Sequence, residues 1–393
     1  MNNVSLNSLF LIFIALVAYM LPAIPVGGVD LDVSQVILWT LIVTYFFKTT
    51  YLKSARGFFY IIPLTLIFFF VLMPFINTSS IVNTAENSIS PRWYELYHSL
   101  VSKFYYDKSR GFFLILHLLE LYFIFLIAYK IGLEKQSYNK ILSFSFFLLI
   151  AIQVIVAIFQ KYLGVERPAG TLSNAQAIGC ICTPIFIYMI NSKWKYIYLI
   201  FFMLLLFLSD TRSSSATFLL IILISLFKYK TIFKAAVAVA VLNFILSVVF
   251  VANEELQTAV IGVAYAVFGN TSTLTIRYIL WESSFMEVLR MSPLFGTFGH
   301  IPLFADNVYW FFLVPFGLVG LSAYVLFFYK TARISRDKQL ILLLFAFFFQ
   351  GISYYGYMIA PDGYLWWGLL GYFAGMSMKN NNLCKSYLLE KKV

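Results

Sequence analysis

The sequence predicts an all-α polytopic integral membrane protein with about twelve transmembrane helices and one larger outer loop between spans 9 and 10. Three observations lead to this prediction. Of 393 residues, 61% are apolar and only 11% are charged, whereas a soluble domain carries about 25% charged residues. Apolar blocks recur that approach the roughly 20 helical residues needed to cross a bilayer. Basic residues gather in alternate loops between those blocks.

Twelve apolar segments are predicted to be spans. No Lys or Arg precedes the first, so we expect a retained helix rather than a cleavable signal peptide. No soluble domain is expected, so residues 1–393 form one membrane domain that ends in a basic tail, 379–393. The spans are expected at residues 9–25, 33–47, 58–76, 111–129, 141–159, 174–190, 196–208, 216–227, 235–252, 303–329, 339–359 and 364–378.

The distribution of Lys and Arg predicts the orientation of these spans. With the N-terminus inside, the inner loops hold 19 of the 28 basic residues, although the outer loops contain more residues. This asymmetry follows the positive-inside rule. Both termini are therefore expected in the cytoplasm, and the net charge of +11 requires no nucleic-acid partner.

The kind of base differs between the two faces. The inner loops hold sixteen Lys and three Arg, whereas the outer loops hold three Lys and six Arg. A guanidinium binds phosphate or carboxylate through two parallel hydrogen bonds, whereas an ammonium is a point charge. The outer face is therefore predicted to hold an anion. The alternative is that single arginines pair with outer acids such as Glu86, Glu166 or Glu287. The six outer arginines are Arg92, Arg110, Arg167, Arg212, Arg277 and Arg290.

The polar stretch SDTRSSSAT, residues 209–217, separates two apolar segments. Lys195 and Lys228 flank these two apolar segments, and only 32 residues lie between them, fewer than the roughly 40 needed for two full crossings. Asp210 and Arg212 are therefore expected at membrane depth, where a charge faces a polar cavity or a partner. Asp210 or Ser209 is expected to cap the next helix, whose amides then add to an anion site. An Arg212–Asp210 pair that only ends a helix is the alternative.

The longest outer segment, 253–302, contains a predicted short amphipathic helix that Pro293 stops. Arg277, Trp281 and Ser284 lie at positions i, i+4 and i+7, and so on one face of this helix. An Arg beside an indole suits a sugar phosphate, because the cation meets the phosphate and the ring stacks on the sugar. An interfacial helix with its Trp in the aromatic belt is the alternative.

Asp306 and Asn307 are expected to begin span 10 at the outer surface. The helix dipole stabilises a carboxylate there, so Asp306 is either a cap or a general base for a hydroxyl proton. His300 is the only histidine of this region, whereas His117 and Glu120 on a membrane helix are expected to hydrogen-bond locally. No HExxH or CxxC pattern is present, so neither a metal nor another cofactor is predicted.

In their order along residues 160–378, these outer elements resemble the O-antigen polymerase (Wzy-type) and O-antigen ligase superfamily. The ligases carry His-Asn, nine residues and Gly-x-x-Gly, and this chain has the same spacing with Asp in place of His. The matching elements are Arg167-Pro-Ala-Gly170 with Asn174, Thr211-Arg212-Ser213, Arg277-Tyr-Ile-Leu-Trp281, Pro293-Leu-Phe-Gly296, and Asp306-Asn307 before Gly317-Leu-Val-Gly320.

The resemblance implies a metal-independent, GT-C-like glycosyltransferase of the bacterial inner membrane, multi-pass and active at the periplasmic face. Its substrate would be a sugar chain on undecaprenyl pyrophosphate. Because an acidic residue at 306 is more similar to polymerases, we expect a polymerase of O-antigen or capsule. It would move the growing chain to a hydroxyl of a lipid-linked repeat unit. The expected catalytic residues are Asp306, Arg212 and Arg277, and the expected substrate-binding residues are Arg167, Asn174, Trp281, His300, Asn307 and Tyr309.

Two alternatives stay open. A ligase would transfer finished polymer to lipid A core, with His300 in the role of the missing histidine. A flippase of lipid-linked oligosaccharides belongs to a different class and predicts charges through the middle of many spans. The expected partners are the lipid-linked oligosaccharide, membrane lipid and a chain-length regulator.

Overall fold

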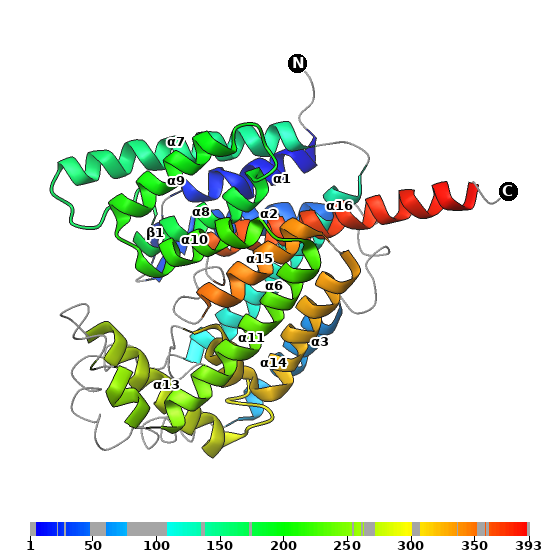
Figure 1. Cartoon of the computed structure of the whole chain (residues 1–393). Helices are drawn as coiled ribbons and strands as arrows, with labels where there is room; N and C mark the ends of the chain where they lie inside the picture. The colour runs from blue at the N-terminus through cyan, green and yellow to red at the C-terminus, as the bar shows by residue number, and fades with distance from the viewer. Residues whose placement is uncertain are drawn as a thin grey trace.

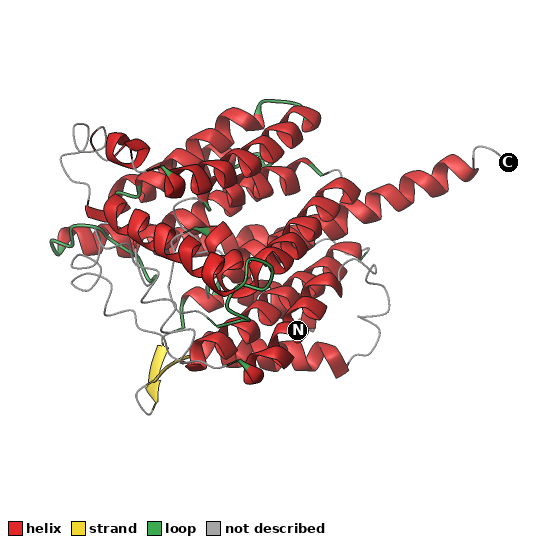
Figure 2. Ribbon diagram, turned by 90° about the horizontal axis from the view of Figure 1, so that it is seen from below, coloured by secondary structure: helices red, strands yellow, loops and turns green. Residues whose placement is uncertain are grey.

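The computed structural model is a bundle of α-helices, and its only described strands form one small hairpin (Figures 1 and 2). The hairpin pairs β1 (Ala23–Val26) with β2 (Val29–Asp32) in antiparallel register. The predicted predominantly α-helical fold is therefore confirmed, while the small hairpin was not predicted. The structure describes residues 5–21, 23–26, 29–47, 60–76, 108–134, 138–172, 175–253, 255–260, 262, 272–300, 307–335, 337–351, 358 and 361–390.

Each predicted span overlaps a described apolar helix, and the predicted outer helix corresponds to α13, which ends two residues before Pro293. The last helix continues beyond its predicted end at residue 378 into the basic tail. The helices are α1 (Leu6–Ala15), η1 (Val17–Tyr19), α2 (Val33–Phe47), α3 (Ile61–Leu72), η4 (Met73–Phe75), α6 (Lys108–Leu133), α7 (Asn139–Tyr162), α8 (Ala175–Met189), α9 (Lys195–Ser209), α10 (Arg212–Ser225), α11 (Tyr229–Ala252), α13 (Ser272–Met291), α14 (Val308–Ser335), α15 (Lys338–Gln350) and α16 (Asp362–Glu390).

Four helices of the described chain are long and apolar enough to cross a membrane. Seven shorter apolar helices, of 10–17 residues, accompany them in the described ranges. The 15 residues of α9 cover only about 22 Å at 1.5 Å per residue, less than a bilayer core of about 30 Å. The chain therefore has the character of a helical membrane protein, while the twelve-span topology and its orientation stay predictions. The four long segments are Gly111–Leu133, Asn139–Tyr162, Tyr229–Leu246 and Val308–Arg333.

The α6–α16 pair forms the centre of the bundle, and glycines let the two helices approach closely. A Cβ on Gly371 would collide with the carbonyl oxygen of Phe125, and a Cβ on Gly375 would collide with that of Tyr129. Gly132 of α6 lies equally close to the backbone of α16. Small residues at such interfaces bring backbones together, which increases van der Waals contact where no hydrophobic effect operates between helices.

A kink in α14 anchors the loop that follows α13. Gly317 has φ 58° and ψ −161° and interrupts the helix two residues after Pro315. Gly296, with φ 60°, lies against the kink, and a Cβ on either glycine would clash with the backbone of the other segment. The Pro293–Gly296 and Gly317–Gly320 motifs therefore pack as one unit. Four backbone hydrogen bonds join the segments 293–299 and 314–319, from the amides of Thr297 to Val314 (2.8 Å), Gly299 to Pro315 (2.6 Å), Leu318 to Pro293 (3.0 Å) and Val319 to Leu294 (3.1 Å).

We predict that Gly296→Ala and Gly317→Ala each destabilise the fold by more than about 2 kcal/mol, because backbone clash adds to the strain of a positive φ. Gly164→Ala is the matched control. Gly164 has φ 83°, but no heavy atom lies within 4 Å of the position that a Cβ would occupy, so this variant should cost only the left-handed strain of about 1–2 kcal/mol. Thermal unfolding in detergent measures all three. Equal losses in the three variants would contradict the packed unit.

Candidate functional site

Arg167 contacts the turn between α9 and α10. Its Nε donates to the carbonyl oxygen of Ser209 (3.4 Å), and its Nη2 donates to that of Asp210 (3.1 Å). These carbonyls lie at the C-terminal end of α9, where the helix dipole favours a cation. The structure therefore brings two predicted site motifs together, although they lie more than 40 residues apart in the chain. We call residues 163–172 the Arg167 loop.

Two glutamines of α7 hold the Arg167 loop in place. Oε1 of Gln160 accepts from two successive loop amides (both 2.9 Å), and its Nε2 donates to the carbonyl oxygen of Gly170 (2.7 Å). Gln153 accepts from the amide of Thr171 (2.9 Å) and donates to its hydroxyl (2.6 Å). Neither glutamine was predicted as a site residue. The available signal is a pair of amides seven residues apart, on one face of a largely apolar helix.

The turn itself differs from the prediction. Asp210 ends α9 as its C-cap in the left-handed conformation, with φ 48° and ψ 47°. Thr211 is the N-cap of α10 but makes no side-chain capping bond, and its hydroxyl lies 3.1 Å from that of Ser209. The prediction that Asp210 or Ser209 caps α10 is therefore wrong. The left-handed conformation of Asp210 reverses the chain direction between α9 and α10. The Ser209 hydroxyl donates to the carbonyl oxygen of Leu206 within α9 (3.3 Å).

A buried polar cluster lies where α8, α10, α15 and α16 meet. The Nε2 of Gln350 donates to the hydroxyl of Ser214 (3.1 Å) and contacts the Sγ of Cys180 (3.4 Å). The Nε1 of Trp366 donates to the carbonyl oxygen of Cys180 (2.8 Å). We call these four residues, each at most 2% exposed, the Gln350 cluster. Because an unpaired polar group is costly among apolar side chains, the cluster aligns the four helices near the α9–α10 turn.

The start of α14 joins the same end of the bundle. The amide of Val308 donates to the carbonyl oxygen of Gly351, which directly follows α15 (2.7 Å). Asn307 is fully buried, and its Oδ1 accepts from the amide of Tyr309 (2.8 Å), as expected of an N-cap. The Tyr309 hydroxyl donates to the carbonyl oxygen of Ala240 on α11 (2.7 Å). We call this end, where α9 and α15 finish and α10, α14 and α16 begin, the polar end.

Helix α13 packs on α11 and α14, and in Figure 1 it lies apart from α10. Arg277 is half-buried, whereas Trp281 is 5% exposed and belongs to the hydrophobic core. The helix is present as predicted, so the spacing of Arg277, Trp281 and Ser284 places them on one face. The structure thus joins Arg167 to the turn, while Arg277 lies on a helix with other packing partners.

Glu287 is a buried acid on α13. It is fully buried, and neither of its carboxylate oxygens makes a hydrogen bond with a described residue. The hydroxyls of Ser283 and Ser284 are also buried and also make no hydrogen bond with the described residues. Burial raises the pKa of Glu287 well above its ordinary range, because the charged form loses its hydration. Pairing of Glu287 with an outer arginine, the alternative considered for this acid, is absent from the described part of the chain.

The two described histidines have hydrogen-bonding partners. His300 is 3% exposed, and its Nε2 lies 3.4 Å from the carbonyl oxygen of Met73. The Nδ1 of His117 lies 2.8 Å from Oε2 of Glu120, so the expected local hydrogen bond is confirmed. The Tyr364 hydroxyl also donates to Glu120 (3.2 Å) and extends this buried group to α16.

Of the remaining predicted site residues, Asp306 and Asn174 lie outside the described residues, and Arg212 begins α10. Within the described ranges, no three His, Cys, Asp or Glu side chains gather as a metal site would require. Comparison with known proteins finds no family model and no curated protein that matches this chain.

We predict that Glu287→Gln stabilises the protein at pH 8 and that the gain shrinks as the pH falls toward 4. A raised folded-state pKa means that the unfolded chain ionises first as the pH rises, so the wild type loses up to about 1.4 kcal/mol per pH unit relative to the variant. Thermal unfolding in detergent across that pH range is the measurement. Glu282→Gln, a partly exposed neighbour on α13, is the control. A pH profile unchanged by Glu287→Gln would contradict the burial of a neutral acid.

Proposed function

We propose that this protein is a polysaccharide polymerase of the bacterial inner membrane, of the O-antigen polymerase (Wzy-type) class that its sequence resembles. It transfers a growing glycan from undecaprenyl pyrophosphate to a hydroxyl of a lipid-linked repeat unit at the periplasmic face. The observation that carries the proposal is the Arg167 guanidinium held against the α9–α10 turn. This contact places the Arg167 motif beside the Thr211-Arg212-Ser213 motif at the polar end.

In the proposed reaction, the acceptor hydroxyl oxygen attacks the anomeric carbon of the growing chain. The bond from that carbon to the pyrophosphate oxygen breaks, and undecaprenyl pyrophosphate leaves with the bonding electrons. Asp306 takes the hydroxyl proton. Arg212 and Arg277, together with Arg167, stabilise the negative charge that develops on the leaving group, which is where preorganised donors have their largest effect.

The local structure supports an anion site at the polar end. The N-terminal amides of α10 have no partners within the helix, and their dipole attracts an anion. Arg167 is exposed and kept in position by the α9 carbonyls, while Gln153 and Gln160 fix the backbone of its loop. The Gln350 cluster adds a rigid base, because its members connect four helices. A preorganised site of this kind loses little energy to reorganisation during the reaction.

One observation favours the flippase as a second candidate. Glu120 is 1% exposed and lies near the middle of the long apolar segment Gly111–Leu133, with His117 and Tyr364 bonded to it. Ionisable groups inside a membrane often mark ion or substrate paths. The polymerase remains the preferred proposal, because the arginine motifs that suit a pyrophosphate occur on one predicted face rather than through the spans.

We predict that Arg277→Ala and Arg212→Ala abolish long chains in a strain that lacks the chromosomal gene, while protein levels stay normal. Loss of one electrostatic donor should lower the transfer rate by roughly 10²–10³-fold. Arg290→Ala is the matched control, because Arg290 is an exposed arginine in the last turn of the same helix. It should keep the ladder of surface polysaccharide on an electrophoretic gel.

The deletion strain separates the candidates. A single repeat unit on lipid A core, with the ladder gone, supports the polymerase. Bare core with long chains on undecaprenyl pyrophosphate indicates a ligase. Bare core with unpolymerised lipid-linked units on the cytoplasmic side indicates a flippase. Normal ladders in both arginine variants would overturn the assigned roles of those residues.

A further inference from the structure

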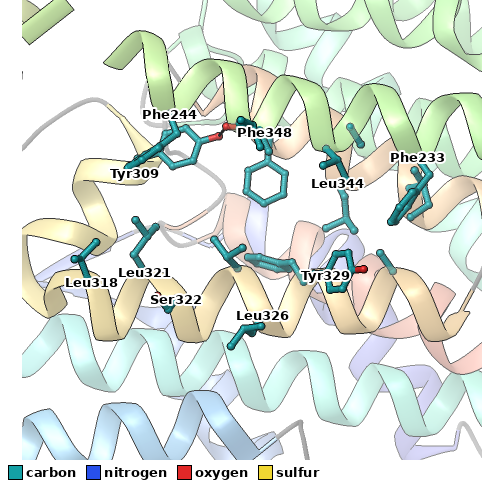
Figure 3. A pocket seen from close by; sticks show the side chains of 18 residues that line it. Phe233, Phe244, Tyr309, Leu318, Leu321, Ser322, Leu326, Tyr329, Leu344 and Phe348 are labelled. Carbon is teal, nitrogen blue, oxygen red and sulfur yellow. Dashed lines mark hydrogen bonds between the residues drawn. The ribbon is translucent and has the colours of Figure 1, made fainter. Parts of the chain in front are cut away.

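His117 and Glu120 form a titratable pair on α6, in the centre of the bundle. The side chain of Glu120 is 1% exposed and that of His117 is 15% exposed. By contrast, the apolar groove between α11 and α14 has no charged side chain in its described lining (Figure 3). A charge inside a membrane domain is costly unless it is paired. The hydrogen bonds of the pair therefore decide which form it takes.

The contact with Met358 fixes the position of the first proton of His117. The Nε2 of the ring lies 2.9 Å from the backbone carbonyl oxygen of Met358, a residue that is 1% exposed. A carbonyl oxygen only accepts, so Nε2 carries a hydrogen and donates it. A neutral imidazole has a single N–H, so the Nδ1 of a neutral His117 would be an acceptor.

A second proton must lie between His117 and Glu120. Nδ1 is 2.8 Å from Oε2 of Glu120, and an ionised carboxylate, like the Nδ1 of a neutral ring, only accepts. Two acceptors at this distance repel each other, so one proton bridges them, bonded to Nδ1 or to Oε2. The Tyr364 hydroxyl donates to the other oxygen, Oε1 (3.2 Å), and a donated hydrogen bond favours the ionised carboxyl group. The bridging proton therefore belongs to the ring.

The elements packed on α6 bring further acids and phenols. Helix α3 has no titratable residue over its whole length, and α2 has only Tyr45. Helix α16 brings Asp362 and Tyr364 at its N-terminal end, and Tyr19 of η1 interacts electrostatically with both. None of these four side chains is a base. The imidazolium is therefore the group that neutralises the carboxylate.

The carbonyl that His117 binds belongs to the connection between α15 and α16. Gly351, at the start of this connection, accepts from the amide of Val308, where α14 begins (2.7 Å). Asp362, directly after the connection, begins α16. Through Met358, His117 thus joins α6 to the segment that links three helix ends of the polar end.

We infer that His117 and Glu120 form a buried proton-binding site, an imidazolium–carboxylate pair that holds one proton in common and anchors the carbonyl of Met358. The pair has no net charge, so the bundle retains a carboxylate in an apolar segment at less cost than an unpaired acid. This site requires no particular substrate at the polar end, because the acceptors around the ring alone determine it. It therefore exists whether the protein is a polymerase, a ligase or a flippase.

Histidine NMR counts these protons directly, because the chain contains only three histidines. The full-length protein, labelled with ¹⁵N-histidine, is placed in lipid nanodiscs at about pH 7.5, where an unperturbed histidine is mostly neutral. A His117→Gln variant assigns the signals. Both ring nitrogens of His117 should carry a proton in the wild type. In Glu120→Gln, the new amide donates to Nδ1 and accepts from Tyr364, so only Nε2 should stay protonated.

Glu134→Gln is the matched control. Glu134 directly follows α6 and also accepts from a tyrosine, Tyr138 (2.7 Å). This variant should leave both ring nitrogens of His117 protonated. A wild-type ring with a single protonated nitrogen would overturn the ion pair. Loss of the proton from Nε2 in Glu120→Gln would overturn the anchor at Met358.

Thermal unfolding in detergent at the same pH tests the charge of the pair. His117→Ala leaves a carboxylate without its partner, which is more costly than the absence of both charges. The double variant His117→Ala/Glu120→Gln should therefore unfold at a higher temperature than His117→Ala alone. A double variant that unfolds at or below the temperature of the single variant would contradict the imidazolium–carboxylate pair.

Discussion

The cost of an unpaired polar group in hydrocarbon is the constraint on which this structure depends. A bilayer offers no hydrogen-bonding partners, so in a chain that is 61% apolar a buried polar side chain is stabilised when it bonds another side chain or the backbone. Glu287, Ser283 and Ser284 of α13 are exceptions. Arg167 bonds the end of α9, Asn307 caps α14, and Gln350 connects α10 with α8. Because these pairings gather at one end, the same constraint that stabilises the bundle also assembles its candidate site.

Hydropathy predicts the helices well, because an apolar run of this length has few alternatives to a helix. The end of α13 before Pro293 follows equally from a local rule, since proline disfavours a helical residue before it. The prediction that Asp210 caps α10 is wrong for a physical reason. An Asp is an N-cap of the following helix only in an extended backbone conformation. Asp210 instead has the left-handed φ of 48° that ends α9, and this conformation depends on how α9 and α10 pack.

The site is only partly readable from the chain. The resemblance orders the Arg167 and Arg212 motifs along the sequence, but nothing local places Arg167 against the carbonyls of Ser209 and Asp210. Gln153 and Gln160 act on a loop up to 18 residues further along, so their role depends on the tertiary fold. The same holds for the backbone contact of Gly296 with Gly317, two glycines that the motifs identify without explaining.

The most direct test of this account is the side of the membrane that the polar end faces. Glu166→Cys places a thiol in the exposed Arg167 loop, and Lys193→Cys places one on the exposed turn at the opposite end of α9. The native Cys180 and Cys182 are buried, and both variants carry Cys384→Ser to remove the third native thiol. In cells with an intact inner membrane, an impermeant maleimide should label the first variant and reach the second only after permeabilisation. Labelling of the second variant alone in intact cells would contradict a polar end that works on periplasmic glycans.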